Sequence, residues 1–410
     1  MNAKKDTPFL ALAVCSLLTL TFMKFRLAAI PLSDILLLLC FAIFFLRTGY
    51  FKLTLYSYLL ACFVILSLVL SLLSGGADSL MSSLKLLLPL FLVMAANGRF
   101  QQFNGADMLK MTKWLLYFGV LSQLLVVVLF YTGLAGWLFN VVEPGNLNRT
   151  IIEFKINVFL VPLIGLHRFS SLFIEPSWYA FFFGFFLILY FYQCRKAGLK
   201  ITLLQDGAIV LAFVLTLSFT GLVFLLIAYL YRFIDGRYPL RLVIAVPLVI
   251  ALLAWVLLTN DYLAHRIYLI STGNDGSFNA RIFASFDKAV FILKHSDWLG
   301  AGPGQTLPLI NEYFNENLTI QNAYLEAFAA TGVFGGLLFI IVMHFSLLRH
   351  GNVFLQLPLA LALCVSSVIF TPIFWLFSFY ILHLARVLAE QKQSDESRHA
   401  GTEREPVCNE

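Results

Sequence analysis

The chain has 410 residues, of which 60% are hydrophobic and 12% are charged, and its mean hydropathy is +0.87. Soluble domains carry about 25% charged residues, so this composition excludes a soluble globular protein and predicts a polytopic integral membrane protein. The net charge of +6 does not indicate nucleic-acid binding, because the basic residues are scattered between apolar runs. The 42 phenylalanines suit lipid-facing helices.

Apolar runs long enough to cross a bilayer, which takes about 20 residues, recur along the chain. We expect an all-α fold of about twelve transmembrane helices, in three blocks: five helices in 1–135 (8–23, 29–46, 53–73, 80–96, 114–135), four in 175–259 (175–193, 201–217, 219–233, 239–259) and three in 322–388 (322–345, 353–370, 372–388). Two larger loops, 136–174 and 260–321, separate the blocks, and the polar tail 389–410 is expected to be disordered.

The basic residues set the predicted orientation. With the N-terminus inside, alternate connections carry the Lys/Arg excess, as the positive-inside rule requires, and the short external loops hold only Lys24 and Arg26. Both larger loops then lie outside and both termini are cytoplasmic. The six cysteines show no disulfide framework and no metal-ligand spacing. No internal repeat is visible, so an inverted-repeat transporter gains no support.

The end of the first loop carries a candidate anion site. Pro176 suits the first position of a helix, which makes Glu175 the expected N-cap, and Arg168 lies just before it. The helix N-terminus would then direct its free amides and positive dipole end towards the external side. The alternative is an interfacial arginine anchor with a capping carboxylate.

The second loop contains an amphipathic pattern at 278–295, with Arg281, Lys288 and His295 spaced seven residues apart on one helical face. Such a cationic stripe on a helix at the membrane surface would suit a pyrophosphate, and the alternative is an ordinary solvated face. The apolar face is expected to contain five positions: Phe278, Ile282, Phe286, Ala289/Val290 and Leu293.

A glycine-rich turn follows at 300–304. Its backbone amides, with Gly302 at the centre, could form a nest for phosphate, although a purely structural turn is the alternative. Four aromatic residues could stack on sugar rings, although aromatic residues also gather at membrane interfaces: Trp178, Trp298, Tyr313 and Tyr324. No HExxH, P-loop or Asp-rich metal motif is present.

Four motifs in this order resemble the O-antigen polymerase and ligase family (Wzy-type polysaccharide polymerases and their relatives). They are Arg168-x-Ser170-x-x-Phe173-x-Glu175-Pro176-Ser177; Ser218-Phe219-Thr220-Gly221; Arg281 followed by 295–304; and Gln321-Asn322-Ala323-Tyr324-Leu325-Glu326 with 331–336. With the many-span layout, the resemblance covers roughly residues 20–385. Its ligase members usually have His-Asn where this chain has Gln321-Asn322, which favours a polymerase.

The resemblance implies a GT-C-like glycosyltransferase of the bacterial inner membrane, acting at the periplasmic face on undecaprenyl-pyrophosphate-linked oligosaccharide. Arg168 and Arg281, with Lys288, would hold the pyrophosphate without a metal or other cofactor. Glu175 or His295 would accept the acceptor hydroxyl proton, a choice that the sequence leaves open. Asn322, Gly302 and Thr220 would contact substrate, and a chain-length regulator and a flippase are expected partners. A ligase and a lipid-linked oligosaccharide transporter are the alternatives.

Overall fold

The computed structural model describes residues 54–87, 105–142, 156–161, 166–171, 176–196, 198–233, 276–316, 319–349 and 356–364, with short stretches or single positions within 26–39, 90–94 and 265–272 and at 369. The expected spans 8–23, 239–259 and 372–388, nearly all of 29–46, and the tail 389–410 lie outside the described residues. The described part is mostly helical, with five short strands. The all-α prediction is therefore right about the helices and wrong about these strands.

Three described stretches are long and apolar enough to cross a membrane: Leu55–Ser74, Leu109–Thr132 and Ala323–Phe345. They belong to the helices α3 (Leu55–Ser74), α6 (Gly105–Thr132) and α15 (Ala323–Arg349). The remaining helices are α4 (Ala77–Leu84), α7 (Pro176–Lys196), α8 (Leu203–Val214), α9 (Phe219–Phe233), α12 (Gly276–Arg281), α13 (Phe283–His295), α14 (Thr306–Phe314) and α16 (Gln356–Cys364). The transmembrane class is supported, whereas twelve spans and a GT-C-like arrangement remain predictions.

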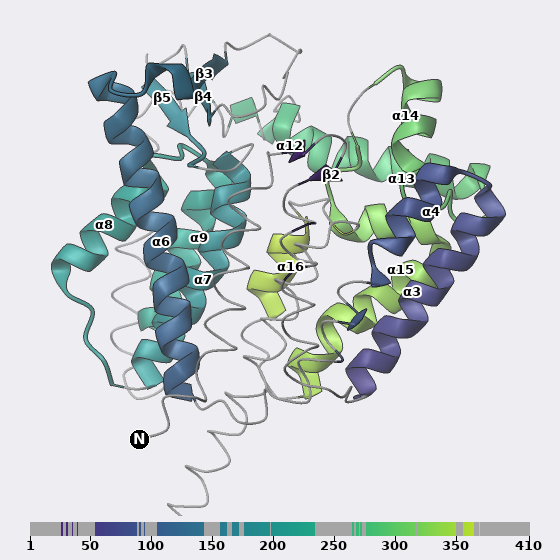
Figure 1. The fold of residues 1–410 in the computed structure, drawn as a ribbon, viewed down its shortest axis with the longest axis horizontal. Coiled ribbons are helices and arrows are strands. Elements are labelled where there is room, and N and C mark those ends of the chain that lie inside the picture. The colour runs from purple at the N-terminus through teal and green to yellow at the C-terminus, as the bar shows by residue number, and fades with distance from the viewer. Residues whose placement is uncertain are drawn as a thin grey trace, which may run out of the picture.

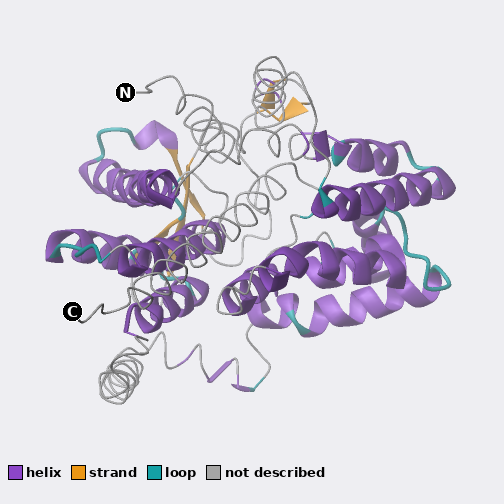
Figure 2. Ribbon diagram, turned by 90° about the horizontal axis from the view of Figure 1, so that it is seen from below, coloured by secondary structure: helices purple, strands orange, loops and turns teal. Residues whose placement is uncertain are grey.

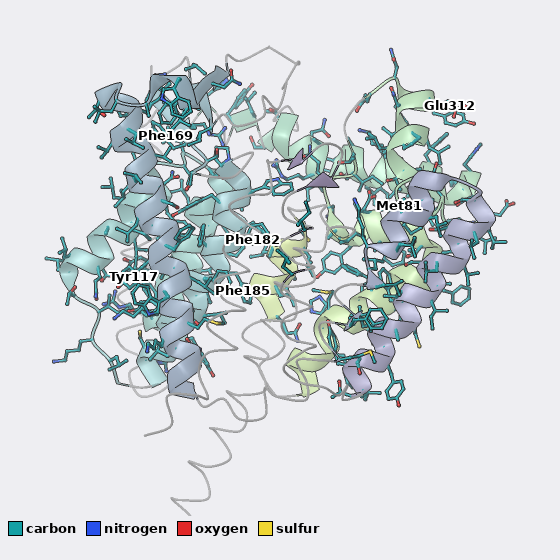
Figure 3. All side chains as sticks on the ribbon, viewed as in Figure 1. Met81, Tyr117, Phe169, Phe182, Phe185 and Glu312 are labelled. Carbon is teal, nitrogen blue, oxygen red and sulfur yellow. The ribbon has the colours of Figure 1, made fainter. Side chains whose placement is uncertain are left out.

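One group of helices is built around α7, which packs against α6 and α9 (Figure 1). Its sequence is hydrophobic on all sides, and a helix of that kind is stable only when it is surrounded. Accordingly its side chains from Tyr179 to Tyr190 are buried, and Figure 3 shows Phe182 and Phe185 on this helix, facing the interior of the molecule. The expectation that phenylalanines face lipid is wrong for α7.

The short helices α8 and α9 pair at one side of this group. They have 12 and 15 residues, about 18 and 22 Å at 1.5 Å per residue, so each is shorter than a full span of about 30 Å. The expected break between the spans 201–217 and 219–233 is confirmed, and it covers residues 215–218. There Thr216 Oγ1 donates to the Phe213 carbonyl at 2.7 Å, and Leu217 has φ 42°. An Asp206–Arg232 ion pair joins the two helices.

A second group contains α3, α4, α13, α14 and α15, and Figure 2 shows the two groups on opposite sides of the molecule. The helix α3 begins at a capping box between Thr54 and Ser57 and ends at Gly75 with φ 69°. It packs along α15, with the Phe63 and Phe339 rings 5.9 Å apart. The helix α16 contacts both α7 and α15, so it links the two groups.

The first larger loop contains a three-stranded sheet rather than irregular chain alone. After the 3₁₀ turn η2 (Gly136–Leu138), β3 (Phe139–Val142) runs parallel to the central strand β4 (Ile156–Val161), which pairs antiparallel with β5 (Leu166–Phe169). A separate pair joins β1 (Arg26–Leu27) to β2 (Ile30–Pro31). Figure 1 shows β3–β5 at the same end of the helices as α12–α14, which belong to the second loop.

Candidate functional site

Arg168 lies on β5, opposite Phe159 of β4, and reaches the turn between α8 and α9. Its Nε donates to the Thr216 carbonyl at 3.3 Å, and the Phe169 amide donates to the Leu215 carbonyl at 3.2 Å. The strand is therefore bound to the turn by two consecutive residues. The arginine occupies a fixed place rather than the end of a free loop.

The same strand is also anchored to α6. Gln123 Nε2 donates to the Phe169 carbonyl at 3.1 Å, and the hydroxyls of Ser122 and Ser171 are 2.8 Å apart. The Phe169 ring, labelled in Figure 3, is buried against Phe130 with 5.4 Å between ring centroids. Hydrogen bonds and aromatic packing thus hold Arg168 from two sides.

Thr220 lies in the first turn of α9, four residues after the carbonyl that Arg168 binds. The adjacent Gly221 approaches this turn so closely that a Cβ there would lie 2.9 Å from Thr216 Oγ1. The structure therefore brings Arg168 and Thr220 to one corner. Pro176 is the first residue of α7, as predicted, and Glu175 lies outside the described residues.

The predicted single helix at 278–295 is two helices. It breaks at Ile282, with α12 ending at Arg281 and α13 beginning at Phe283. Ser285 stabilises the break: its hydroxyl donates to the Ala280 carbonyl at 2.5 Å and accepts from the Gln321 amide at 2.9 Å. Arg281 is half-buried at this junction, where the start of the second-loop helices meets the segment before α15.

The expected cationic stripe on α13 is wrong in its orientation. Lys288 is buried, with 5% of its surface exposed, and its Nζ forms an ion pair with Glu316 Oε2 at 2.6 Å. Ala289 and Leu293 are buried as predicted, whereas Phe286 is 56% exposed. The physical reason is that α15 and the segment after α14 cover the lysine side of the helix, so its aliphatic stem contributes to packing.

His295, at the end of α13, is exposed. Its ring stacks on Phe291 with centroids 5.9 Å apart, and its Nε2 lies 3.3 Å from the Tyr313 hydroxyl. This contact connects α13 to α14. The histidine is the one described candidate for proton transfer among the predicted residues, and its exposed position leaves room for a hydroxyl-bearing substrate.

Asn322 forms the N-terminal cap of α15. Its Oδ1 accepts hydrogen bonds from the amides of Tyr324 and Leu325 at 3.1 and 3.2 Å, and the side chain is buried. An asparagine here satisfies amides that a helix start leaves unpaired. The predicted substrate contact by Asn322 would therefore use its amide nitrogen rather than Oδ1.

Sequence reasoning missed Glu326, in the first turn of α15. The residue is buried, Oε1 accepts from the Thr306 hydroxyl at 2.7 Å, and Oε2 has no hydrogen-bond partner among the described residues. The signal was available, because an ionisable residue beside a long apolar run is a functional candidate by default. The carboxylate links the beginning of α14 to the beginning of α15.

The glycine-rich turn is seated against a break in α15. Gly332 has φ 70° and ψ −174°, which interrupts the helix. The amides of Ala301 and Gly302 donate to the carbonyls of Ala329 and Ala330, each at 2.9 Å. Because the Gly302 amide is engaged in this way, the geometry favours the structural interpretation of the turn over a phosphate nest.

The elements that carry the described predicted residues lie at the same end of the molecule, in two regions (Figure 1). One is the β5–α9 corner, with Arg168 and Thr220. The other consists of α12, α13, the turn that follows and the start of α15, and it holds Arg281, Lys288, His295, Gly302 and Asn322, with Glu326 added by the structure. No protein-family description matches the chain, and no curated protein matches it either.

Proposed function

We propose that this chain is a metal-independent membrane glycosyltransferase that polymerises undecaprenyl-pyrophosphate-linked oligosaccharide repeat units at the outer face of the inner membrane. The observation that carries the proposal is that elements of both larger loops share one end of the molecule: β5 with the fixed Arg168, and α12 and α13 with Arg281 and His295. Fixed cations at the place where negative charge develops are the preorganised stabilisation that such a reaction needs.

In the proposed reaction the acceptor hydroxyl oxygen attacks the anomeric carbon of the growing chain. The new glycosidic bond forms while the bond from that carbon to the pyrophosphate oxygen breaks, and the leaving pyrophosphate takes the electron pair. Arg168 and Arg281 stabilise its charge. The hydroxyl proton passes to His295 or to Glu175, and Thr220 and Asn322 orient the sugars.

Lys288 takes a changed role in this proposal. Because its ammonium is already paired with Glu316, it contributes to the folded shape of the second loop and to the local positive potential rather than acting as a direct pyrophosphate ligand. Direct binding is assigned to the two arginines, whose planar guanidinium groups suit phosphate oxygens.

One observation favours the transporter alternative: α15 is broken at Gly332, and broken helices are typical of transporter sites. In those sites the backbone groups freed by the break bind the substrate or ion. Here the carbonyls of Ala329 and Ala330 accept from the turn, and the Val333 amide donates to the Trp298 carbonyl at 3.2 Å. The freed groups are used within the protein, which supports an enzyme with an anchored loop over a transport site.

The test is a surface-polysaccharide gel of a strain lacking the gene, complemented with wild type, Arg168→Ala, Arg281→Ala or the matched control Lys294→Ala. Lys294 is an exposed cation on α13. We expect the two arginine variants to leave core with a single repeat unit and no long ladder, and the control to restore the ladder.

The lipid-linked intermediates distinguish the alternatives. Full-length polymer on its lipid carrier with none on the core would identify a ligase, and single lipid-linked units retained on the inner leaflet would identify a transporter. An unchanged ladder from well-expressed Arg281→Ala would refute the assigned role of that arginine.

A further inference from the structure

The turn at 296–304 packs against the break in α15, where the helix backbone is interrupted. Within a bilayer, non-helical backbone is tolerated only where protein or water satisfies its polar groups. The turn meets that condition through the two carbonyls and one amide of α15 that it pairs. The fit is close: a Cβ on Gly300 would lie 2.3 Å from the Gly332 nitrogen, and one on Gly332 would lie 2.5 Å from the Leu299 carbonyl carbon.

The register between α3 and α15 gives the depth of this contact. A Cβ on Gly335 would lie 3.3 Å from Leu66 Cδ2, and the Phe339 ring packs on the Phe63 ring. The helices are thus antiparallel, and Gly332 is level with about residues 69–70 of α3. At 1.5 Å per residue that level lies about 7 Å before the end of α3 at Ser74.

The length of α3 sets the scale, because its 20 mostly apolar residues match the roughly 30 Å of a bilayer's hydrocarbon core. Its end at Ser74 therefore lies near one edge of that core. The Trp298 carbonyl, which is bonded to Val333, then lies inside the hydrocarbon region rather than above it. In contrast, Gly302 contacts Ser74, so the turn rises back to the edge within a few residues.

Two neighbouring side chains of the turn are apolar and exposed, and the exposed carboxylate of Asp297 directly precedes them. Trp298 and Leu299 are 52% and 59% exposed. Phe334, which follows the residue bonded to the Trp298 carbonyl, is 79% exposed. On α15, Phe334 begins a stripe that continues through Leu337 and Ile341, spaced as residues on one helical face. The tip of the turn therefore extends the lipid-facing stripe of a membrane-spanning helix.

We propose that residues 296–304 form a re-entrant turn, and that Trp298 and Leu299 contact the acyl chains of the bilayer. The lack of side chains at Gly300 and Gly302 lets the turn approach the α15 backbone, and the carbonyls of Ala329 and Ala330 pair the amides of Ala301 and Gly302. The Trp298 and Leu299 side chains point into lipid. This membrane contact is independent of the reaction proposed above. It anchors α13 and α14 to the bilayer on either side of the turn.

The test places nitroxide labels on single cysteines in the full-length protein, with the six native cysteines replaced by serine, in phosphatidylcholine–phosphatidylglycerol vesicles. The test position is Leu299→Cys, with Leu337→Cys as the lipid-facing reference and Glu312→Cys, exposed on α14 (Figure 3), as the aqueous reference. We expect the label at 299 to collide more with oxygen than with a water-soluble nickel chelate, as at 337. The label at 312 should show the reverse.

Two outcomes would overturn the proposal. Access of the nickel chelate to position 299 equal to that at 312 would place the turn in water, and protection from both reagents would mean that another protein surface, such as a second copy, covers it. A second measurement keeps all native cysteines: wild type and Trp298→Phe are compared in vesicles brominated near the headgroup end of the acyl chains. The variant should lose part of the lipid-quenched emission, and equal quenched emission in both proteins would refute the contact.

Discussion

The two helix groups differ in what lies against particular glycines. On α6 and α7, a Cβ added at Gly119 or Gly184 would meet the side chains of Phe183 or Phe224. Where the turn meets α15, a Cβ at Gly300 or Gly332 would meet main-chain atoms. Side chains can rotate to make space whereas paired backbone cannot, so the second group should tolerate far less change.

The largest expected effect is that of Gly332→Ala. It combines the strain of φ 70° with ψ −174°, a region that is nearly exclusive to glycine and costs another residue about 1–3 kcal/mol, with a clash against the backbone of Trp298 and Leu299. We expect a total destabilisation above about 3 kcal/mol, measured as a lower thermal unfolding midpoint in detergent. Gly75→Ala is the matched control, because Gly75 has φ 69° and open space around it. Equal shifts for the two variants would contradict the backbone clash.

Removal of the Lys288 partner should have the next largest effect. Glu316→Ala removes the carboxylate that is ion-paired with the buried Lys288 ammonium, and we expect a loss of about 2 kcal/mol. The double variant Lys288→Met/Glu316→Ala should recover most of that loss, since no buried charge remains. Glu312→Ala on neighbouring α14 should change stability by less than about 0.5 kcal/mol. A double variant as unstable as Glu316→Ala would show that the charge is not the cause.

The Thr306–Glu326 contact should have a somewhat smaller effect. Thr306→Val removes the hydroxyl that bonds the buried carboxylate, and we expect a loss of about 1–2 kcal/mol, read from the same unfolding midpoint. Thr132→Val serves as the control, because that exposed hydroxyl only bonds its own helix at the Val128 carbonyl. Equal unfolding midpoints for the two variants would show that the hydrogen bond from Thr306 does not stabilise the Glu326 carboxylate.

The smallest expected effect comes from the α7 side. Gly119→Ala should cost about 1 kcal/mol, because the Phe183 ring must move while the helix gains from losing a glycine. Gly119→Ala/Phe183→Leu should restore stability towards that of Phe183→Leu alone. The corresponding pair Gly332→Ala/Leu299→Ala should show no recovery, because the obstacle there is main chain. Recovery of stability in both double variants would contradict the proposed difference between side-chain and main-chain obstacles in the two groups.

Several features follow from the sequence because they depend on neighbouring residues alone. Apolar length identifies the membrane helices α3, α6 and α15, and Pro176 marks the beginning of α7, since a proline fits the first helical position and few others. The polar break between the spans 201–217 and 219–233 is equally local. The elements that carry Arg168 and Arg281 lie at one end of the molecule.

Other features were decided only by tertiary structure. Helical periodicity relates Lys288 to Arg281 and His295, but it does not determine which face a neighbour will cover, and Glu316 lies 28 residues away. The break in α15 likewise depends on hydrogen bonds from a turn about 30 residues earlier in the chain. A periodic pattern records only the spacing of side chains along one helix, whereas burial and backbone pairing are set by whatever packs against it.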